Sequence, residues 1–420
     1  MNLTDFLAAE WKPALGCTEP AAIAWAASLA AAQGTGAVRF VRLVCDPRTY
    51  KNCYAVGLPN SERRAGILWA LAIGSCLRDP SLGLRCFEQV DAEILATATA
   101  LVEQRGLNVD VDADAAELLV DVTVVREHGT GRALLERDHT RLTKLERDGR
   151  MVGGEAAGGG GAGAGPDLRE QAANLPVAAL PEIARSATAG DRARLREGAA
   201  MNIAIARHGL SLMPARFVEA GTHDSLTRLS RLVASGVHAR MSGEPMTVMS
   251  LAGSGNKGIT LSVPLTLWGR EAGIAEERID EALAVGALLT SATTFHLGTL
   301  SAVCGAANAA GIGIAGAVVH LEGGSATQIG LAISNMVGNV AGMICDGAKI
   351  GCALKTMTGV DAAFRAASLA LADVGIPASD GIVGTDGESS LANLGRLARY
   401  GMAATDTEIL DIMQGKLQSA

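Results

Sequence analysis

The sequence predicts an α+β protein, with a mixed α/β N-terminal domain over residues 1–165 and a largely α-helical, Gly- and Ala-rich domain over residues 166–420. Runs of β-branched residues typical of strands occur in the first third of the chain and are scarce afterwards. Between the two parts lies the stretch 152–166, whose glycines cannot bury a core and indicate a flexible linker or long loop. A chain of 420 residues is long enough for two or three domains, so we place the boundary in this stretch.

The N-terminal part is expected to open with a helix over 4–33 that Pro13 and Pro20 interrupt. A polar insert, 16–19, predicts a turn between the two prolines. The elements expected after it are a strand over 38–44, a strand over 54–58, a helix over 62–77, and strands over 118–127 and 132–147 joined by a hairpin.

The second domain is expected to be built from successive helices, because strand signals are scarce in it. These helices are predicted over 169–180, 191–209, 219–235, 276–290, 325–343, 362–371, 389–399 and 406–417. No Asp, Glu, Lys or Arg occurs between Glu281 and Glu322, a run long enough to span a bilayer. Gly, Ala, Ser, Thr and Asn dominate it and no Trp or Tyr flanks it, which favours a buried core over the membrane-protein alternative.

Composition also limits the classes of partner, the cellular location and the roles of the cysteines that we expect. The net charge is -8, aromatic residues make up 3% of the chain and no basic stripe occurs, so we expect no nucleic-acid partner. The first residues do not have the pattern of a secretory signal, and we expect a cytoplasmic protein. Eight cysteines are too few for a disulfide scaffold and are more typical of a metal site or of catalysis.

The strongest local pattern is the pair Cys345 and Cys352. In one unbroken helix they would lie about 10.5 Å apart along the axis, so Asp346-Gly347 and Gly351 are expected to bend the backbone and close this gap. Thiolates at such a bend suit an iron–sulfur centre or zinc, with Cys304 as the natural third ligand. The alternative is that small cysteines simply fill a small-residue core.

Other candidates are weaker. Cys17, in the turn between the prolines, is a candidate base or nucleophile, against the alternative of a structural cysteine. The segment 253–258, GSGNKG, offers backbone N–H groups to an anion, although a plain turn explains it equally well and no strand-turn-helix context is evident. Lys51 and Asn52 place a cation and an amide on an expected loop.

Taken together, these segments resemble the L-cysteine desulfidase group, a serine dehydratase alpha-like family that is similar to the iron–sulfur L-serine dehydratases. The resemblance runs from about residue 10 to the C-terminus. It is carried by 13–20 (PALGCTEP), Lys51-Asn52, 253–256 (GSGN), 300–305, 335–339 (NMVGN), 342–349 (GMICDGAK), 352–355 (CALK), 380–384 (DGIVG) and Gly401-Met402.

The resemblance implies a 4Fe-4S lyase that acts without pyridoxal phosphate on a small amino-acid substrate. Cys304, Cys345 and Cys352 would hold three irons and leave the fourth open for the leaving group, and Cys17 would be the base that removes the α-hydrogen. The carboxylate and amine of the substrate are assigned to Lys51, Asn52, Ser254, Gly255 and Asn256.

Cysteine is the expected substrate, because an alkyl thiol suits soft iron. The alternatives are L-serine or another β-substituted amino acid, or a non-catalytic sensor that carries the cluster. Two departures from the family pattern bear on the substrate: Lys257 follows Gly-Ser-Gly-Asn, and Phe295-His296 precede the segment 298–301. A homo-oligomer remains open.

Overall fold

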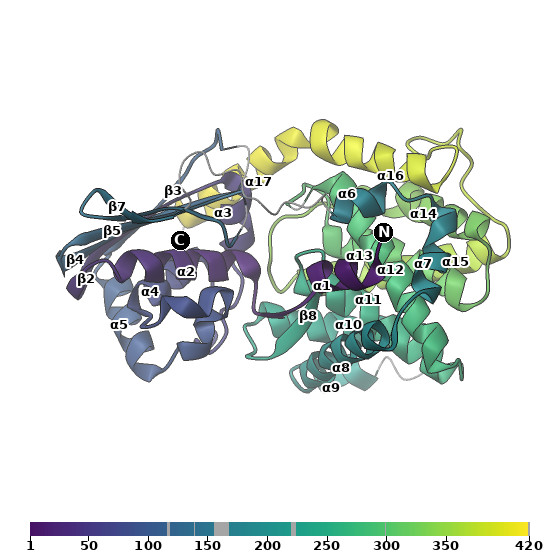
Figure 1. Cartoon of the computed structure of the whole chain (residues 1–420), viewed down its shortest axis with the longest axis horizontal. Coiled ribbons are helices and arrows are strands. Elements are labelled where there is room, and N and C mark those ends of the chain that lie inside the picture. The colour runs from purple at the N-terminus through teal and green to yellow at the C-terminus, as the bar shows by residue number, and fades with distance from the viewer. Residues whose placement is uncertain (116–117, 138, 155–167, 220–223, 299, 419–420) are drawn as a thin grey trace.

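The computed structural model describes residues 1–115, 118–137, 139–154, 168–219, 224–298 and 300–418. It confirms the predicted α+β class, with an N-terminal sheet and its helices beside a helical domain (Figure 1). The division at residue 165 falls between 155 and 167, outside the described residues, and stays a prediction.

The N-terminal domain is built on a six-stranded sheet of order β3-β2-β4-β5-β6-β7, in which β2 and β3 are parallel and the other pairs antiparallel. Its strands are β2 (Thr35–Cys45), β3 (Leu107–Val111), β4 (Leu119–His128), β5 (Thr130–Glu136), β6 (Leu142–Arg147) and β7 (Arg150–Gly153). Alternate residues of β4, Val120, Val122 and Val124, are fully buried, as expected for a sheet with one covered face. The strand expected over 132–147 is in fact the two strands β5 and β6.

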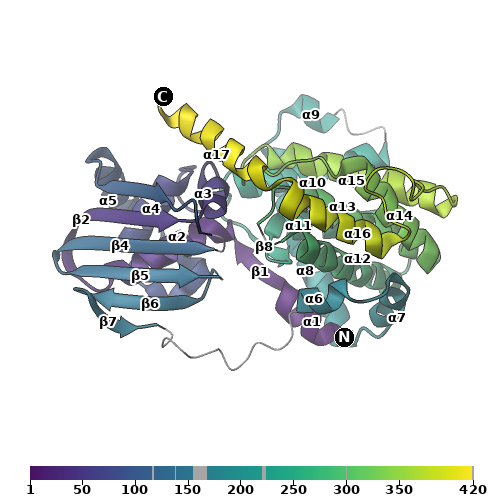
Figure 2. The same ribbon diagram turned by 90° about the horizontal axis from the view of Figure 1, so that it is seen from above.

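Helices cover one face of this sheet: α2 (Thr18–Ala31) lies on it, with α4 (Ile67–Cys76), α5 (Ala92–Glu103) and the 3-10 segment η1 (Pro80–Gln89) behind (Figures 1 and 2).

The predictions for Lys51-Asn52 as a loop and for 54–58 as a strand are wrong. Helix α3 (Pro47–Cys53) forms because the Asp46 side chain accepts hydrogen bonds from the amides of Arg48 and Thr49, both 3.0 Å, with a proline in the first turn.

The first residues of the chain pack in the helical domain. The expected interrupted helix is instead α1 (Leu3–Glu10), the strand β1 (Trp11–Leu15) and α2. Strand β1 pairs antiparallel with β8 (Thr247–Leu251) in a two-stranded sheet, where Pro13 is tolerated because both strands are edges. The N-terminal domain is thus tied into the helical core by its own first segment.

The helical domain contains α6 (Leu168–Ala173), η2 (Val177–Ala179), α7 (Leu180–Arg185), α8 (Ala189–Ser211), α9 (Ala215–Glu219), α10 (Ser225–Met241), α11 (Gly255–Glu271), α12 (Glu276–Leu297), α13 (Gly305–Leu321), α14 (Ala326–Val340), α15 (Cys352–Leu371), α16 (Gly387–Arg396), η3 (Leu397–Gly401) and α17 (Ala403–Gln418). Most predicted helices are present, but 169–180 is broken into shorter pieces around Pro176, a residue that cannot donate a backbone hydrogen bond.

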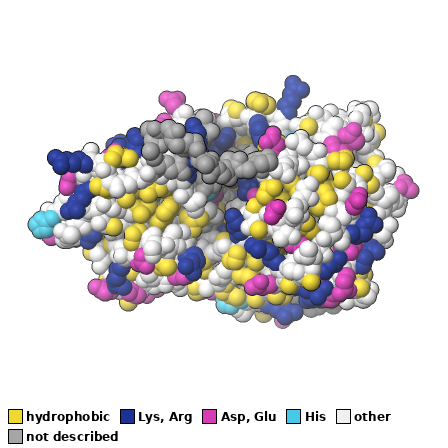
Figure 3. Space-filling view, in the orientation of Figure 1, with side chains coloured by type: hydrophobic (Ala, Val, Ile, Leu, Met, Phe, Trp, Pro, Cys, Tyr) yellow, Lys and Arg dark blue, Asp and Glu magenta, His cyan; other side chains and the backbone are white. Residues whose placement is uncertain are grey.

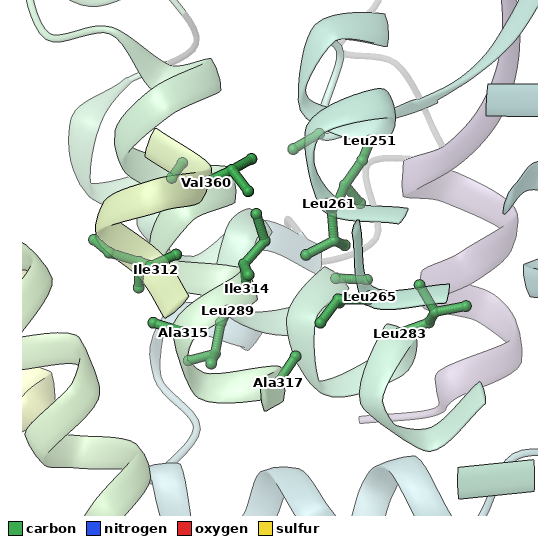
Figure 4. Close-up of a cluster of buried hydrophobic side chains, with 14 of the residues drawn as sticks. Leu251, Leu261, Leu265, Leu283, Leu289, Ile312, Ile314, Ala315, Ala317 and Val360 are labelled. Atoms are coloured by element: carbon green, nitrogen blue, oxygen red, sulfur yellow. The ribbon is translucent and has the colours of Figure 1, made fainter. Parts of the chain in front are cut away.

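Helices α11 and α13 are not among the predicted helices, although the uncharged run that contains α13 is expected to form a buried helical core. In α11, 13 of the 17 residues are buried, and in α13, 15 of the 17 are, so both helices lack the amphipathic period that identifies a surface helix. Their side chains meet those of α12 in the core of the domain, where Leu261, Leu289 and Ile314 lie close together (Figure 4). In the described part of the chain, no helix is both long and apolar enough to cross a membrane.

Helix α17 runs from the helical domain back to the N-terminal domain (Figures 1 and 2). Leu410 on this helix belongs to the buried core of the N-terminal domain, and the hydroxyl of Tyr54 donates a 3.2 Å hydrogen bond to the carbonyl of Met413. The two domains are therefore connected at both ends of the chain.

Candidate active site

A cavity of about 110 Å³ lies where the two domains meet. The N-terminal domain contributes Cys17, Asn52 and His139 to its wall, and the helical domain contributes Arg240, Ser254, Asn256, Lys257, Cys304, Cys345 and Cys352. Seven of the nine site residues predicted from the sequence therefore line one cavity. The other two, Lys51 and Gly255, lie beside it.

A second, larger cavity of about 710 Å³ shares Thr18, Gly253 and Ser301 with the first. Its described lining holds Lys12, Arg48, Arg137, Arg169 and Arg399 against the acidic Glu10 and Asp46. Lys and Arg side chains are visible on the helical domain next to the junction (Figure 3). A positive approach of this kind attracts anionic ligands.

Two of the three late cysteines are fixed by backbone pairing. Val303 and Ile344 form an isolated antiparallel bridge. The amide of Cys304 donates to the carbonyl of Met343 at 2.9 Å, and the amide of Cys345 donates to the carbonyl of Ala302 at 2.7 Å. Cys304 is also the N-cap residue of α13, although its side chain makes no capping hydrogen bond. Two cysteines that lie 41 residues apart in the sequence are thus held on adjacent segments joined by one short ladder.

The third cysteine follows a bend, as predicted. Residues 345–351 are not helical, Gly347 has a φ of 92°, and α15 begins at Cys352. A Cβ on Gly347 would lie 2.1 Å from the carbonyl oxygen of Lys51, so this position requires glycine on grounds of space as well as conformation. The loop is therefore pressed directly against α3.

Cys345 and Cys352 lie close enough to Cys304 to affect its ionisation. Burial, together with the nearby Cys345 and Cys352, raises the pKa of Cys304 to about 12. Among the described residues, no three His, Cys, Asp or Glu side chains converge closely enough for a single metal ion. Ligands of a multi-iron cluster stand further apart than those of one ion, and three thiols around one cavity are the donor chemistry of iron–sulfur centres. The donor set therefore fits such a cluster better than it fits zinc.

Basic side chains surround the cysteine loop. Asp346 pairs with Lys349 and with Lys355. Although burial opposes ionisation of Asp346, hydrogen bonds and charge from the two lysines lower its pKa to about 2. Lysine charges close to thiols favour the thiolate form that a metal needs.

Cys17 is the N-cap of α2 and follows Gly16, whose φ is 69°. The predicted turn is present, but it does not expose the thiol, which is 4% exposed. Burial raises the pKa of Cys17 to about 12, opposed chiefly by the positive charge of Arg240. In the protein without ligands Cys17 is therefore a protonated thiol at neutral pH.

The segment 253–258 does lie in a strand-turn-helix context, contrary to expectation, because β8 precedes it and α11 begins at Gly255. Ser254 is the N-cap but its side chain makes no capping hydrogen bond. The start of a helix carries unsatisfied N–H groups and a partial positive charge, so this wall of the cavity suits an anion.

Lys51 holds parts of the structure together. Its buried ammonium donates to the carboxylate of Asp406 on α17 at 2.5 Å and to the carbonyl of Cys345 at 2.8 Å. The neighbouring Asn52 lines the cavity. Of this predicted pair, only Asn52 therefore presents a side chain to a ligand.

Sequence reasoning did not identify the three basic residues of the cavity wall as site residues: Arg240, Lys257 and His139. Lys257 is buried, which together with the charge of Arg169 lowers its pKa to about 7. Nε2 of His139 is buried with no hydrogen-bond partner among the described residues. Arg240 and His139 belong to no local motif, whereas Lys257 lies in the segment 253–258 and its departure from the family pattern was a signal.

Comparison with known proteins identifies the family of the chain. The family model described as "serine dehydratase alpha chain" matches residues 125–411. A UPF0597 protein of Geobacter sulfurreducens is 36% identical over 98% of both chains, and one of Oleidesulfovibrio alaskensis is 37% identical over 98% of this chain and 97% of its own. A third, from Caldanaerobacter subterraneus, is 33% identical over 99% of this chain and 98% of its own. The protein therefore belongs to the serine dehydratase alpha chain family.

Proposed function

We propose that the protein is an iron–sulfur-dependent lyase that eliminates sulfide from L-cysteine and yields pyruvate and ammonia without pyridoxal phosphate. One observation carries the proposal: Cys304, Cys345 and Cys352 line the same cavity as Cys17. The family adds support at the level of a serine dehydratase-like lyase. The soft thiol leaving group of cysteine suits iron better than a hydroxyl does.

The three late cysteines are the proposed ligands of a 4Fe-4S cluster. When bound, the cluster supplies an open Lewis-acidic iron to the leaving group. The chain's contribution to holding it is the ladder at Cys304 and Cys345 and the bend before Cys352. The basic side chains Lys349 and Lys355 offset the negative charge that three thiolates bring.

Cys17 is the proposed base. It must first lose its own proton, which the charge of Arg240 and the N-terminus of α2 favour. The Cys17 thiolate then accepts the α-hydrogen as a proton, the electron pair of that bond forms the Cα–Cβ double bond, and the Cβ–S bond breaks with its pair on sulfur. The resulting aminoacrylate tautomerises to an imine, and water converts the imine to pyruvate and ammonia.

L-Serine is the second candidate substrate, since the family model is described as serine dehydratase alpha chain. The same residues would act, with the hydroxyl of serine leaving as water. A cluster-bearing sensor without turnover is the remaining alternative.

The test is a substrate comparison on anaerobically reconstituted protein. Pyruvate is measured with L-cysteine and L-serine at matched concentrations, and sulfide is measured in parallel. We expect kcat/KM to be at least about tenfold higher for L-cysteine, a difference of roughly 1.4 kcal/mol in transition-state binding. A preference for L-serine would replace the proposed substrate, and turnover of neither would favour the sensor.

A further inference from the structure

Arg240 is a buried cation whose pairing is incomplete. It is 4% exposed and lies in the last turn of α10. Its Nη1 donates to Oδ1 of Asn256 at 2.9 Å and its Nη2 donates to the carbonyl of Gly16 at 2.6 Å, while its Nε is buried with no hydrogen-bond partner. Within the described part of the chain, no acidic side chain forms an ion pair with it.

The N-terminus of α11, a second source of positive charge, lies against Arg240. A Cβ on Gly255, the first residue of α11, would lie 2.5 Å from Nε of Arg240, so the guanidinium rests on the start of this helix. Helix α11 spans 17 residues, and its N-cap Ser254 leaves the first N–H groups uncapped by its side chain. A buried guanidinium that forms no ion pair is costly, and Arg240 coincides with a helix N-terminus in the wall of a cavity that Glu19 also lines.

We propose that Arg240 binds the α-carboxylate of the amino-acid substrate, beside the first turn of α11, where the resemblance already assigns Ser254, Gly255 and Asn256 to the carboxylate and amine. The inference rests on the proposed function and adds to it the residue that selects this substrate class. A guanidinium and a carboxylate match in shape and charge, and they can share two hydrogen bonds.

The position of Arg240 also fits the chemistry of the α-carbon. Its hydrogen bond to Gly16 places it against the residue that precedes Cys17. The α-carbon is bonded to the carboxylate carbon, so a carboxylate held by Arg240 brings the α-hydrogen next to the Cys17 thiol. Loss of that hydrogen moves negative charge onto the carboxylate, where a fixed cation stabilises it more strongly than in the ground state.

The test measures binding, independently of turnover. The full-length protein is titrated calorimetrically with L-alanine, which has the carboxylate and amine but no leaving group, and with L-alaninamide, which lacks the carboxylate charge. We expect L-alanine to bind at least about tenfold more tightly than L-alaninamide. Arg240→Gln is expected to remove this difference by weakening L-alanine alone, and Arg240→Lys to retain part of it.

Lys257→Met is the matched control, because Lys257 is the other buried cation of the cavity. If Lys257→Met rather than Arg240→Gln abolishes the preference for L-alanine, the carboxylate binds at Lys257 and the inference is overturned. Equal binding of both ligands to the unmodified protein, or no binding of L-alanine, overturns it as well. This comparison needs no variant, so it holds even if Arg240→Gln fails to fold.

The two proposals fail in different ways. If reconstituted protein releases no pyruvate from cysteine or serine while the calorimetric preference depends on Arg240, the lyase proposal fails and the carboxylate subsite stands. If pyruvate is released but Arg240→Gln binds L-alanine as tightly as the unmodified protein does, only the subsite fails.

Discussion

The ammonium of Lys51 lies 2.5 Å from the carboxylate of Asp406, an ion pair that joins α3 of the N-terminal domain to the C-terminal helix α17. The same ammonium donates to the carbonyl of Cys345. Lys51 is 1% exposed and Asp406 is 13% exposed, so solvent screens the pair little. One side chain therefore ties both domains and the cysteine loop together.

Asp406→Asn is expected to destabilise the protein by about 3–5 kcal/mol, because it leaves the buried ammonium of Lys51 without its counter-charge. Urea unfolding at neutral pH measures the effect. The control is Asp411→Asn, an exposed acid on the same helix, with an expected change within about 0.5 kcal/mol. Equal effects of the two substitutions would show that the pair does not hold the domains together.

Gly347→Ala is expected to cost about 2–5 kcal/mol, the sum of left-handed strain and overpacking against the carbonyl of Lys51. Gly273→Ala provides the comparison, since Gly273 also has a positive φ but its Cβ would meet nothing within 4 Å. There we expect about 1–2 kcal/mol, from strain alone. Stability is read from the urea midpoint, and a Gly347→Ala cost no larger than that of Gly273→Ala would contradict the close contact.

Cys304→Ala, Cys345→Ala and Cys352→Ala are each expected to abolish retention of iron, because a cluster with one open iron has no protein ligand to spare. Cys76→Ser is the control, since Cys76 lies in the N-terminal domain away from the cavity. Iron, acid-labile sulfide and visible absorption are measured after anaerobic reconstitution. Normal iron content in any of the three alanine variants would remove that cysteine from the ligand set.

Cys17→Ala is expected to retain the cluster and to lower kcat by about 10²–10⁴, the usual contribution of a positioned base. Iron content and pyruvate release are measured on the same sample. An unchanged kcat would show that Cys17 is not the base.

Lys257→Met is expected to stabilise the cluster-free protein at and below neutral pH. Burial lowers the pKa of Lys257 to about 7 from 10.5, so folding opposes its charge. The resulting penalty, on the order of a few kcal/mol, is complete below pH 7 and fades as the pH rises towards 10.5. Urea unfolding between pH 6 and 10 should show the unmodified protein approaching Lys257→Met as the pH rises; a constant difference would contradict this.

The fold class and most helices could be predicted from the sequence because they depend on local pattern. The strand at 38–44 and the helix at 276–290 lie within observed elements, β2 and α12. Helices α11 and α13 could not be predicted in this way, because extensive burial removes the periodic alternation of apolar and polar residues that marks a helix. Strand β1 could not be predicted either, because its partner β8 is more than 230 residues away in the sequence.

The same contrast between local sequence pattern and tertiary structure applies to the candidate site. Cys17, Cys304, Cys345 and Cys352 stand in recognisable segments and line one cavity. Arg240 reaches the cavity from the end of α10, with no motif around it. Lys51 has the sequence context of a ligand-binding residue. Its ion-pair partner Asp406 lies on α17, so only the tertiary structure shows that the charge of Lys51 is already neutralised.

The most direct test of the central claim is an anaerobic measurement of iron content and product release on one reconstituted sample supplied with L-cysteine. The account predicts about four irons per chain, together with sulfide and pyruvate in equal amounts. Sulfide and pyruvate released at the same rate by iron-free protein would contradict it.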